Sequence, residues 1–389
     1  MNGPQNSDMI RFSDMLSEAK TDTSPEGIYV AGLRRKLLFI IIISIALICV
    51  AIISLGIGAV NIPVSDTVSA IAHALLPSHF AGPENEWYST ILFQGRLPRI
   101  VLAITTGASL AIAGSVMQGT LRNPLVSPFT LGVSSAASFG AAMSIVYGSS
   151  VFGALYFTQT TIGDYSLSFS TISTMIFSFI TGMASIILVL ILGRKKDTSK
   201  STIILGGVVV GYLFQAGVTF TKYISNDEAL RDITLWLMGG TWNASWGSMI
   251  VLVPVVLITI VLLEGMSFKI NTLSAGDDVA SNLGVDVNKL RRDSLILSTF
   301  ITSVCISFTG IIGFIGLMAP HICRMFIGND SRYLFPASAV MGSLILLSSD
   351  TISRVIIAPS QLPVGIIMYI IGGIFFIWLI SRKNVGEYW

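Results

Sequence analysis

The sequence predicts an all-α polytopic membrane protein, and three observations lead to this fold class. Of the 389 residues, 52% are hydrophobic and only 11% are charged. The mean hydropathy is +0.78. Several apolar runs are long enough for a membrane helix, whereas a membrane barrel would show short segments of alternating polarity. The net charge of +2 is too small to indicate a nucleic-acid partner.

Residues 1–36 are predicted to form a polar cytosolic N-terminal tail. This segment ends in the basic triplet Arg34, Arg35 and Lys36, and an apolar run over 37–60 follows. A cleavable signal peptide is the alternative interpretation. However, the run is longer than the usual signal core, and no small-residue cleavage site ends it. The basic flank therefore predicts a retained first span with the N-terminus inside.

Nine further apolar segments bring the expected number of transmembrane helices to about ten. They lie at 100–118, 129–148, 171–193, 202–221, 248–267, 294–312, 313–328, 335–356 and 362–381. Together they define a transmembrane domain over 37–384, which is followed by a short cytosolic C-terminus at 385–389.

The division near residue 312 needs an argument, because 295–327 is one apolar run of 33 residues. A single helix of that length would measure about 50 Å, against a hydrocarbon core of roughly 30 Å. Splitting the run leaves five basic residues outside and 23 − 5 = 18 inside, as the positive-inside rule requires. The five outside are Arg96, Arg99, Lys222, Arg231 and Arg354. Both termini are then cytosolic.

The stretch 271–292 is the most polar part of the apolar domain, with six charged residues among 22. We expect a cytosolic docking loop, although a solvated connector is the alternative. Ser274 and Asp277 have the spacing of a helix-capping pair. Gly284 suits the end of a short helix, and Asp286 suits the start of the next one.

A faint internal repeat predicts two related halves. At a constant offset of 196 residues, Gly114 matches Gly310, Leu121 matches Leu317, Pro124 matches Pro320 and Gly132 matches Gly328. The two spans that carry the first pair run in opposite directions in the expected topology. Such inverted repeats are common in transporters.

Small and ionisable residues within the spans narrow the mechanism. Gly207 and Gly211 lie one turn apart in the fifth span, where they serve either helix packing or a translocation path. Asp350 and Arg354 have the i, i+4 spacing of a helix-face ion pair. Ionisable residues are otherwise scarce inside the spans, which is unfavourable for a proton-driven carrier.

The sequence contains no signature of a cofactor, metal or nucleotide site. Its three cysteines lie in apolar runs without paired spacing. The pattern GxxxxGK[ST] is absent, because the basic segment at 193–202 lacks the second glycine. We therefore expect no catalytic residues, metal or cofactor on this chain. If ATP is used, another chain binds it.

Five sequence blocks resemble the FecCD, or vitamin B12 permease-like, family of ABC-transporter permeases. The blocks begin with GRLPRIVLAITTGASLAIAGSVMQGTLRNPLVSPFTLGVSSAASFGA (95–141) and WLMGGTWNASW (236–246). They continue with GDDVASNLGV (276–285), GIIGFIGLMAPHICRMFIGNDSRYLFPASAVMGSLILLSSDTISR (310–354) and LPVGIIMYIIGGIFFIWLISRK (362–383). The likeness runs from about residue 37 to 384, and residues 1–33 fall outside it.

The resemblance implies a type II ABC importer permease architecture and a set of partners. These are a second permease chain (a homodimer or a related pair), two ATP-binding subunits and an extracytoplasmic substrate-binding protein. ATP and Mg would be bound by the ATPase, and this chain would lie in the cytoplasmic membrane. The family imports iron-siderophores, haem and vitamin B12. Ferric siderophore is the favoured cargo, and haem or cobalamin is the alternative. An ion-coupled secondary transporter is the rival of a different class.

The resemblance also implies roles for particular residues. Arg96, Arg99 and Arg354 match arginines that pair with acidic residues of the binding protein. Their alternative roles are interfacial snorkelling or an internal pair with Asp350. The residues that match the ATPase-coupling segment are Asp277, Ala280, Leu283, Gly284 and Val285. Gly207 and Gly211 correspond to a helix that lines the central path.

Overall fold

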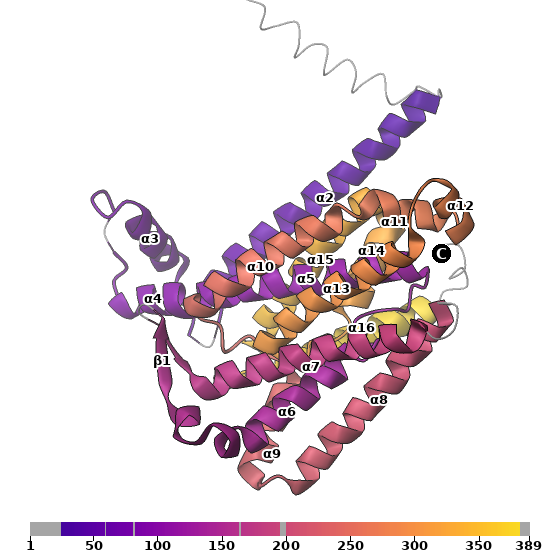
Figure 1. Cartoon of the computed structure of the whole chain (residues 1–389). Coiled ribbons are helices and arrows are strands. Elements are labelled where there is room, and N and C mark those ends of the chain that lie inside the picture. Colours follow the sequence, from indigo (N-terminus) through magenta and orange to yellow (C-terminus); the bar gives the residue numbers. More distant parts are fainter. Residues whose placement is uncertain (1–24, 59, 81, 163–164, 195–199, 382–389) are drawn as a thin grey trace, which may run out of the picture.

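The computed structural model describes residues 25–58, 60–80, 82–162, 165–194 and 200–381, and their fold is a bundle of long helices (Figure 1). The long helices are α2 (Pro25–Gly56), α5 (Leu97–Leu121), α6 (Val133–Phe152), α7 (Phe169–Arg194), α8 (Lys200–Ile224), α10 (Trp246–Glu264), α13 (Val287–Thr309), α15 (Ser331–Ser353) and α16 (Val364–Ser381). A shorter apolar helix, α14 (Ile315–Ile327), lies among them.

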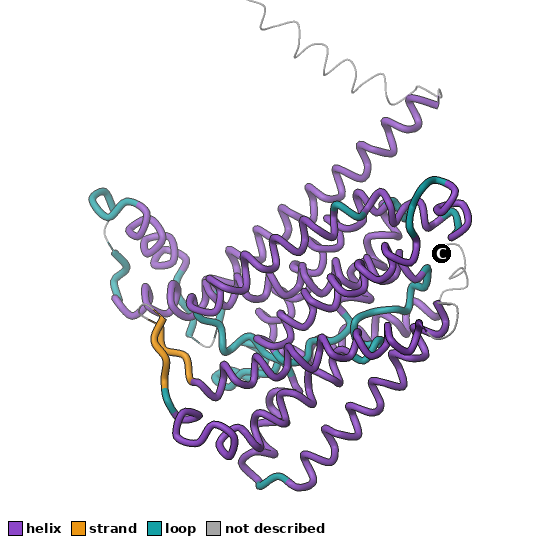
Figure 2. The backbone as a smooth tube through the Cα atoms, viewed as in Figure 1, coloured by secondary structure: helices purple, strands orange, loops and turns teal. Residues whose placement is uncertain are grey.

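Short elements occupy the two ends of the bundle. At one end, called the α9 end, lie α3 (Val64–Leu75), α4 (Glu86–Thr90), the π-helix η1 (Ile91–Arg96), the 3-10 helix η2 (Gly153–Phe157) and α9 (Asp227–Met238). This end also carries an antiparallel hairpin of β1 (Gln159–Ile162) and β2 (Tyr165–Ser168), the only strands among the described residues (Figure 2). At the opposite end, called the α12 end, lie α11 (Ser267–Ser274) and α12 (Asp277–Asn282).

Each of the ten expected spans corresponds to a helix of the described chain. Eight candidate spans are long and apolar enough to cross a membrane, and the protein is therefore a multi-pass membrane protein. The other two are α13, which carries charged residues in its first turns, and the 13-residue α14. Helix α2 begins at Pro25 and its candidate span at Gly32, so residues 25–36 of the expected tail belong to the first helix. The rest of that tail, residues 1–24, and the expected C-terminus at 385–389 lie outside the described residues.

The apolar run at 295–327 divides as the charge argument predicts. Helix α13 ends at Thr309, α14 begins at Ile315, and the intervening segment is not helical. Gly310 and Phe314 have φ angles of +67° and +66°, a conformation that ends one helix and redirects the chain into the next. Of the first pair in the expected repeat, Gly114 lies within α5, whereas Gly310 directly follows α13.

Helix α5 lies at the centre of one group of helices and packs against α15, α13, α14 and α10. Glycine permits the closest of these contacts. A Cβ atom added at Gly107 would lie 2.4 Å from the carbonyl oxygen of Gly342, and one added at Gly114 would lie 1.9 Å from that of Gly316. The backbones of α5, α14 and α15 therefore meet directly, as small residues allow in membrane helices.

A second group consists of α6, α7 and α8, and α13 joins it to the first by packing against both α5 and α7. Here Gly207 and Gly211 of α8 face the start of α6. A Cβ atom at Gly207 would lie 2.7 Å from the Cα atom of Leu131, and one at Gly211 would lie 3.2 Å from that of Gly132. The glycine pair therefore packs α8 against the segment that leads into α6.

Candidate functional site

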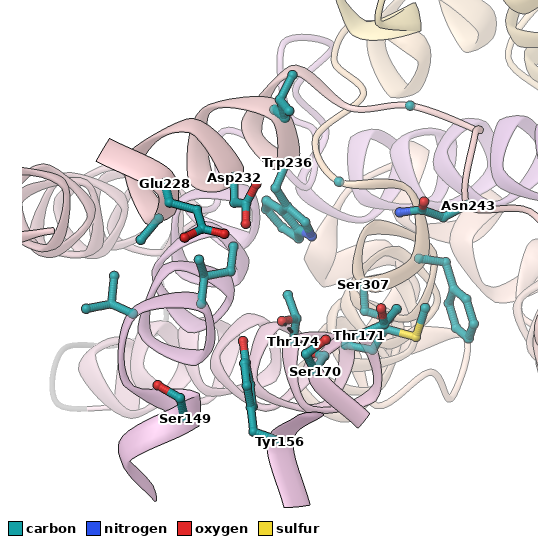
Figure 3. A pocket seen from close by; sticks show the side chains of 18 of the residues that line it. Ser149, Tyr156, Ser170, Thr171, Thr174, Glu228, Asp232, Trp236, Asn243 and Ser307 are labelled. Carbon is teal, nitrogen blue, oxygen red and sulfur yellow. Dashed lines mark hydrogen bonds between the residues drawn. The ribbon is translucent and has the colours of Figure 1, made fainter. Parts of the chain in front are cut away.

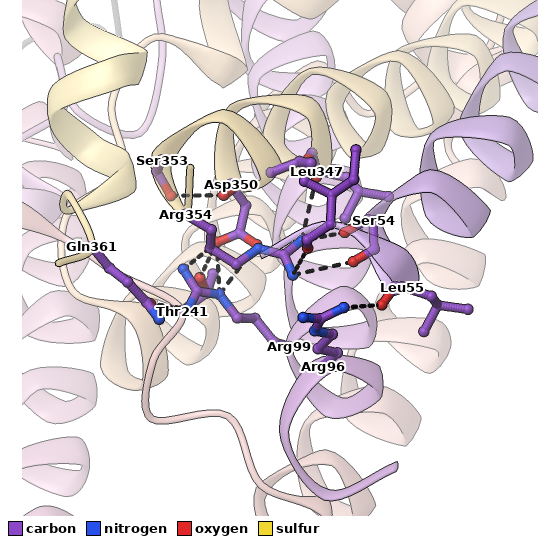
Figure 4. A network of polar contacts seen from close by, with 12 residues as sticks. Ser54, Leu55, Arg96, Arg99, Thr241, Leu347, Asp350, Ser353, Arg354 and Gln361 are labelled. Carbon is purple, nitrogen blue, oxygen red and sulfur yellow. Dashed lines mark hydrogen bonds and ion pairs between the residues drawn. The ribbon is translucent and has the colours of Figure 1, made fainter. Parts of the chain in front are cut away.

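The three arginines singled out in the sequence lie together at the α9 end of the bundle (Figure 4). Arg99 lies in the first turn of α5, and Arg354 directly follows α15. Both bind Asp350, which is fully buried. Nε of Arg99 donates to Oδ1 of Asp350 at 2.9 Å, and Nε of Arg354 lies 3.2 Å from Oδ2. The internal pairing with Asp350 is therefore present for two of the three arginines.

Neutral groups complete this arginine cluster. Arg96, which ends η1, donates to the backbone carbonyls of Leu55 and Val60. Arg354 also donates to the carbonyl of Ser54 at 3.2 Å. Only one carboxylate accompanies three guanidinium groups, so the cluster carries a formal excess of two positive charges.

Two members of the cluster were missed by the sequence reading. The hydroxyl of Thr241 donates to Asp350, and Nη1 of Arg99 donates to the side-chain amide of Gln361. Thr241 lies in the block at 236–246, which could have drawn attention to it. Gln361 belongs to no local pattern and reaches the cluster only through the fold.

A cavity of about 580 Å³ opens beside these residues, and all three arginines line it. Trp242 and Gln361 form part of its wall. The side chains are themselves largely buried, with Arg99 only 7% exposed. A partner would therefore have to reach the guanidinium groups through this cavity.

A second cavity at the α9 end, of about 490 Å³, was not expected from the sequence (Figure 3). Glu228 and Asp232, four residues apart on α9, line it together with Trp236. Tyr156 and hydroxyl side chains of α7 line it as well. Aromatic rings with a few convergent polar groups are typical of small-molecule sites. Trp236 begins the block at 236–246, whereas Tyr156 and the carboxylates of α9 belong to no quoted block, and the fold brings them together.

The expected coupling residues lie at the α12 end and fall into two kinds. Ala280 is fully buried in α12, and Val285 packs against the same hydrophobic cluster. Leu283 is instead 67% exposed, although it is a large apolar residue. Gly284 has a φ angle of +82°, which suits the expected helix end, and turns the chain toward α13.

Asp277 ties α12 to two other helices. Its Oδ1 lies 2.9 Å from Nζ of Lys200 in α8, and its Oδ2 accepts from Nη2 of Arg291 in α13 at 2.8 Å. Burial opposes ionisation of this carboxyl, but the hydrogen bonds from Lys200 and Arg291 outweigh that effect and lower its pKa.

The expected capping pair at the start of α12 is wrong. Ser274 is the last residue of α11, where its hydroxyl donates to the carbonyl of Asn271 at 2.6 Å. Gly276, at a φ angle of +122°, takes the position before α12 without a side-chain cap. A residue with a Cβ atom, such as serine, would be strained at this φ angle, which glycine adopts readily. The start at Asp286 is as expected, because its carboxylate accepts the backbone N–H of Lys289 at 2.9 Å.

A further ionic centre at this end was missed by the sequence reading. Asp330 accepts from Nη2 of Arg332 at 2.7 Å and from Nδ2 of Asn271 at 2.8 Å, and it lies 3.4 Å from Nζ of Lys36. The side-chain hydrogen bond from Arg332 is the main cause of a lowered pKa at Asp330. Asn271, at the start of the charged stretch, is thereby fastened to the N-terminus of α15.

No group of three or more His, Cys, Asp or Glu residues suited to a metal ion occurs in the described part of the chain. The ionic groups above have partners within the protein.

Comparison with known proteins connects this fold to a family. A model of the FecCD transport family matches residues 45–382. The hemin transport system permease of Yersinia pestis is 36% identical over 289 residues, which cover 74% of this chain and 82% of that protein. The Fe(3+)-citrate import system permease of Bacillus subtilis is 35% identical, with coverages of 90% and 96%.

A third relative and a solved structure agree with this assignment. The cobalamin import system permease of Halobacterium salinarum is 36% identical, and the match covers 81% of this chain and 79% of that protein. A structure described as an inward-facing conformation of a metal-chelate type ABC transporter has a TM-score of 0.74 and 29% identity. The match covers 88% of this chain and 98% of the chain in that structure. The chain therefore belongs to the FecCD transport family and is a permease subunit of an ABC importer of the metal-chelate, haem or cobalamin type.

Proposed function

We propose that this permease moves a ferric siderophore across the cytoplasmic membrane by alternating access at the axis of a permease dimer. One observation carries the proposal: a single helical bundle has an arginine-lined cavity at one end and an exposed apolar side chain, that of Leu283, at the other. Leu283 is called the apolar corner below, and ion pairs hold the segment that carries it. The cavity suits an acidic partner outside the cell, and the apolar corner suits an ATPase inside it. ATP and Mg would be bound by that separate ATPase.

The proposed orientation places the α12 end in the cytosol, with both chain termini. The distribution of basic residues supports this orientation through the positive-inside rule. Lys36, Lys200, Arg291 and Arg332 all form their ion pairs at the α12 end. The α9 end would then face the extracytoplasmic binding protein.

In this proposal Arg96, Arg99 and Arg354 receive acidic side chains of the binding protein. The excess positive charge of the cluster and its open cavity support this role. Asp350 would hold Arg99 and Arg354 in position before the partner arrives. Docking would add carboxylates to a site that is short of them, which improves its electrostatic balance.

At the cytosolic end, α12 and the following turn would occupy a groove of the ATPase. Leu283 would enter the partner as an apolar side chain, while Ala280 and Val285 anchor the loop in the permease core. The ion pairs of Asp277 connect this loop to α8 and α13. Movement of the ATPase would thus reach two membrane helices directly.

The translocation path is proposed to run along the side of α8 that faces away from Gly207 and Gly211. The two glycines pack inside this chain, whereas Tyr212 and Leu213 are exposed. A second permease copy facing this exposed side would enclose a path between the two chains. In this proposal Tyr212 and Leu213 of α8 would line the central path, and the two glycines would set the position of α8 within the chain.

Reconstitution tests the whole proposal. Proteoliposomes would contain this chain and its ATPase, with a binding protein loaded in turn with ferric siderophore, haem or cobalamin. We expect ATP-dependent uptake that needs all three proteins and favours the ferric siderophore. Uptake of haem or cobalamin instead would reassign the cargo within the family. Flux through this chain alone, driven by a proton or sodium gradient, would support a secondary transporter and overturn the proposal.

A further inference from the structure

A groove of about 580 Å³ lies between α7 and α13 at the α12 end of the bundle. One wall consists of apolar side chains of α7, including Ile187 and Ile191. The other consists of the first turns of α13, with Lys289, Arg291 and Arg292. The groove therefore changes from apolar to basic across its width.

The apolar wall continues onto the outer surface of the bundle. Ile187 and Ile191 are four residues apart, so they lie on one face of α7, and each is half exposed. Leu192, the residue after Ile191, is also half exposed. On a membrane helix, such a face contacts acyl chains.

The basic wall carries exposed cationic groups. Lys289 is exposed and forms no ion pair within the described part of the chain. Arg292 is exposed and pairs with Asp293 at 2.8 Å. One carboxylate, that of Asp286, also lines the groove, where it accepts the backbone N–H of Lys289. Lys289 and Arg292 thus present two exposed cationic side chains at the groove.

Arg291 gives the groove a buried polar wall. Its side chain is only 4% exposed, and Nη2 is bound to Asp277. Its Nε atom is buried and has no hydrogen-bond partner among the described residues. A buried donor of this kind is costly to leave unpaired.

We propose that this groove binds the phosphate of an anionic phospholipid from the inner leaflet. The inner-leaflet position rests on the orientation given under the proposed function. The headgroup lies against Lys289, Arg291 and Arg292, and the acyl chains follow Ile187 and Ile191. Basic pockets between membrane helices on the cytoplasmic side suit such headgroups. Because Arg291 also holds Asp277, the bound lipid would act directly on the position of the coupling helix α12.

The test measures lipid retained by the full-length permease. The chain is reconstituted in phosphatidylcholine with an equal share of phosphatidylglycerol, extracted in mild detergent, and its bound lipids are quantified by mass spectrometry. We expect retained phosphatidylglycerol in excess of phosphatidylcholine. The double variant Lys289→Gln and Arg292→Gln should lose that lipid about tenfold, because each basic residue near a membrane surface contributes to anionic lipid binding. The cap at Asp286 uses the backbone of residue 289, so the variant keeps it.

A matched control removes two charges elsewhere, through Lys222→Gln and Lys269→Gln, neither of which lines the groove. It should retain the lipid as the unmodified chain does. Equal retention of both lipids by the unmodified chain, or full retention by the groove variant, would overturn the proposal. Displacement by millimolar inorganic phosphate without lipid selectivity, or by the assembled ATPase, would overturn it as well. Retention is measured without transport, so a negative result leaves the proposed function intact.

Discussion

Asp350 is the one acidic side chain that is fully buried in the described chain, and two arginines depend on it. From its position on α15, Asp350 joins Arg99 of α5 and Arg354, which follows α15, in one network (Figure 4). A buried charge that loses its partner is far more costly than an exposed one. The cluster is therefore a structural element as well as a proposed docking site.

Replacing Asp350 with Asn should destabilise the protein strongly. The amide would leave the charges of Arg99 and Arg354 uncompensated, and we expect a loss of about 3–5 kcal/mol. Thermal unfolding in detergent measures the change. Asp66→Asn is the control, because Asp66 is only partly buried and accepts a backbone N–H, from Glu84; it should change stability by less than about 0.5 kcal/mol. Equal shifts for both variants would contradict the importance of the buried cluster.

The docking role is best tested at Arg96, because Arg96 binds backbone carbonyls and its loss leaves the pairs of Asp350 in place. Arg96→Gln should weaken affinity for the binding protein about tenfold, corresponding to about 1.4 kcal/mol for one charge pair. Surface-immobilised binding protein and detergent-solubilised permease provide the measurement. Arg231→Gln removes the same charge from exposed α9 and should leave affinity within about twofold. Equal losses would indicate a diffuse electrostatic effect rather than docking at the cluster.

At the scale of elements, the segment from α11 to α13 is held by polar contacts but presents an apolar corner. Asn271 fastens its start to α15, and Asp277 fastens α12 to α8 and α13. Leu283 remains exposed between these attachments. A firmly held segment with an exposed apolar side chain suits a docking surface that transmits force.

Leu283→Asp should uncouple ATP hydrolysis from import while leaving the permease folded. The side chain is exposed, so the change removes little buried surface, and we expect less than about 0.5 kcal/mol of destabilisation. Binding of the ATPase and the ratio of cargo imported to ATP hydrolysed are the measurements. Asn282→Asp adds the same charge beside it without removing an apolar contact. Normal coupling in the Leu283 variant, or equal uncoupling in both, would refute the role of this corner.

The Asp277 attachment should depend on pH. Its pKa is lowered in the folded protein, so its stabilising contribution is present above the unfolded value, about 3.9, and is lost as pH falls through the folded value. Strong acid should therefore accelerate hydrogen exchange of α12 more in the unmodified protein than in the Asp277→Asn variant. The variant lacks this stabilising contribution at every pH. Asp278→Asn, at the exposed neighbour, should keep the full pH response. An unchanged response in Asp277→Asn would assign the acid effect to other groups.

The local chemistry of this segment explains what the sequence could predict. Gly284 and Asp286 act through their own backbone or the next turn, so their roles are readable from the sequence. The Ser274–Asp277 pair failed because Gly276, and not Ser274, takes the position before α12. The partners Lys200 and Asp330 are distant in sequence, and only the fold brings them to the loop.

At the scale of the whole molecule, apolar length and charge placement predicted the membrane helices. Charge placement also predicted the break between α13 and α14. The hairpin, α9 and the cavity under it were not predicted. Their residues carry no periodic apolar pattern of membrane length, and the cavity joins α6, α7 and α9 only in three dimensions.

The packing of α5 against α14 depends on glycine at position 114. Gly114→Ala should destabilise the protein by about 1–3 kcal/mol, because the new Cβ atom would lie 1.9 Å from the carbonyl oxygen of Gly316. That oxygen also accepts from Nε2 of Gln118 at 3.0 Å, so moving α14 would disturb a second contact. Thermal unfolding of the purified permease measures the loss. Gly206→Ala is the matched control in α8, since its added Cβ atom would meet only Cγ1 of Val189, at 3.9 Å. That change should be neutral or stabilising by up to about 1 kcal/mol, because alanine favours the helix. If Gly114→Ala were tolerated equally well, α14 would have to move away from α5 without cost, and direct backbone contact would not determine how the bundle packs.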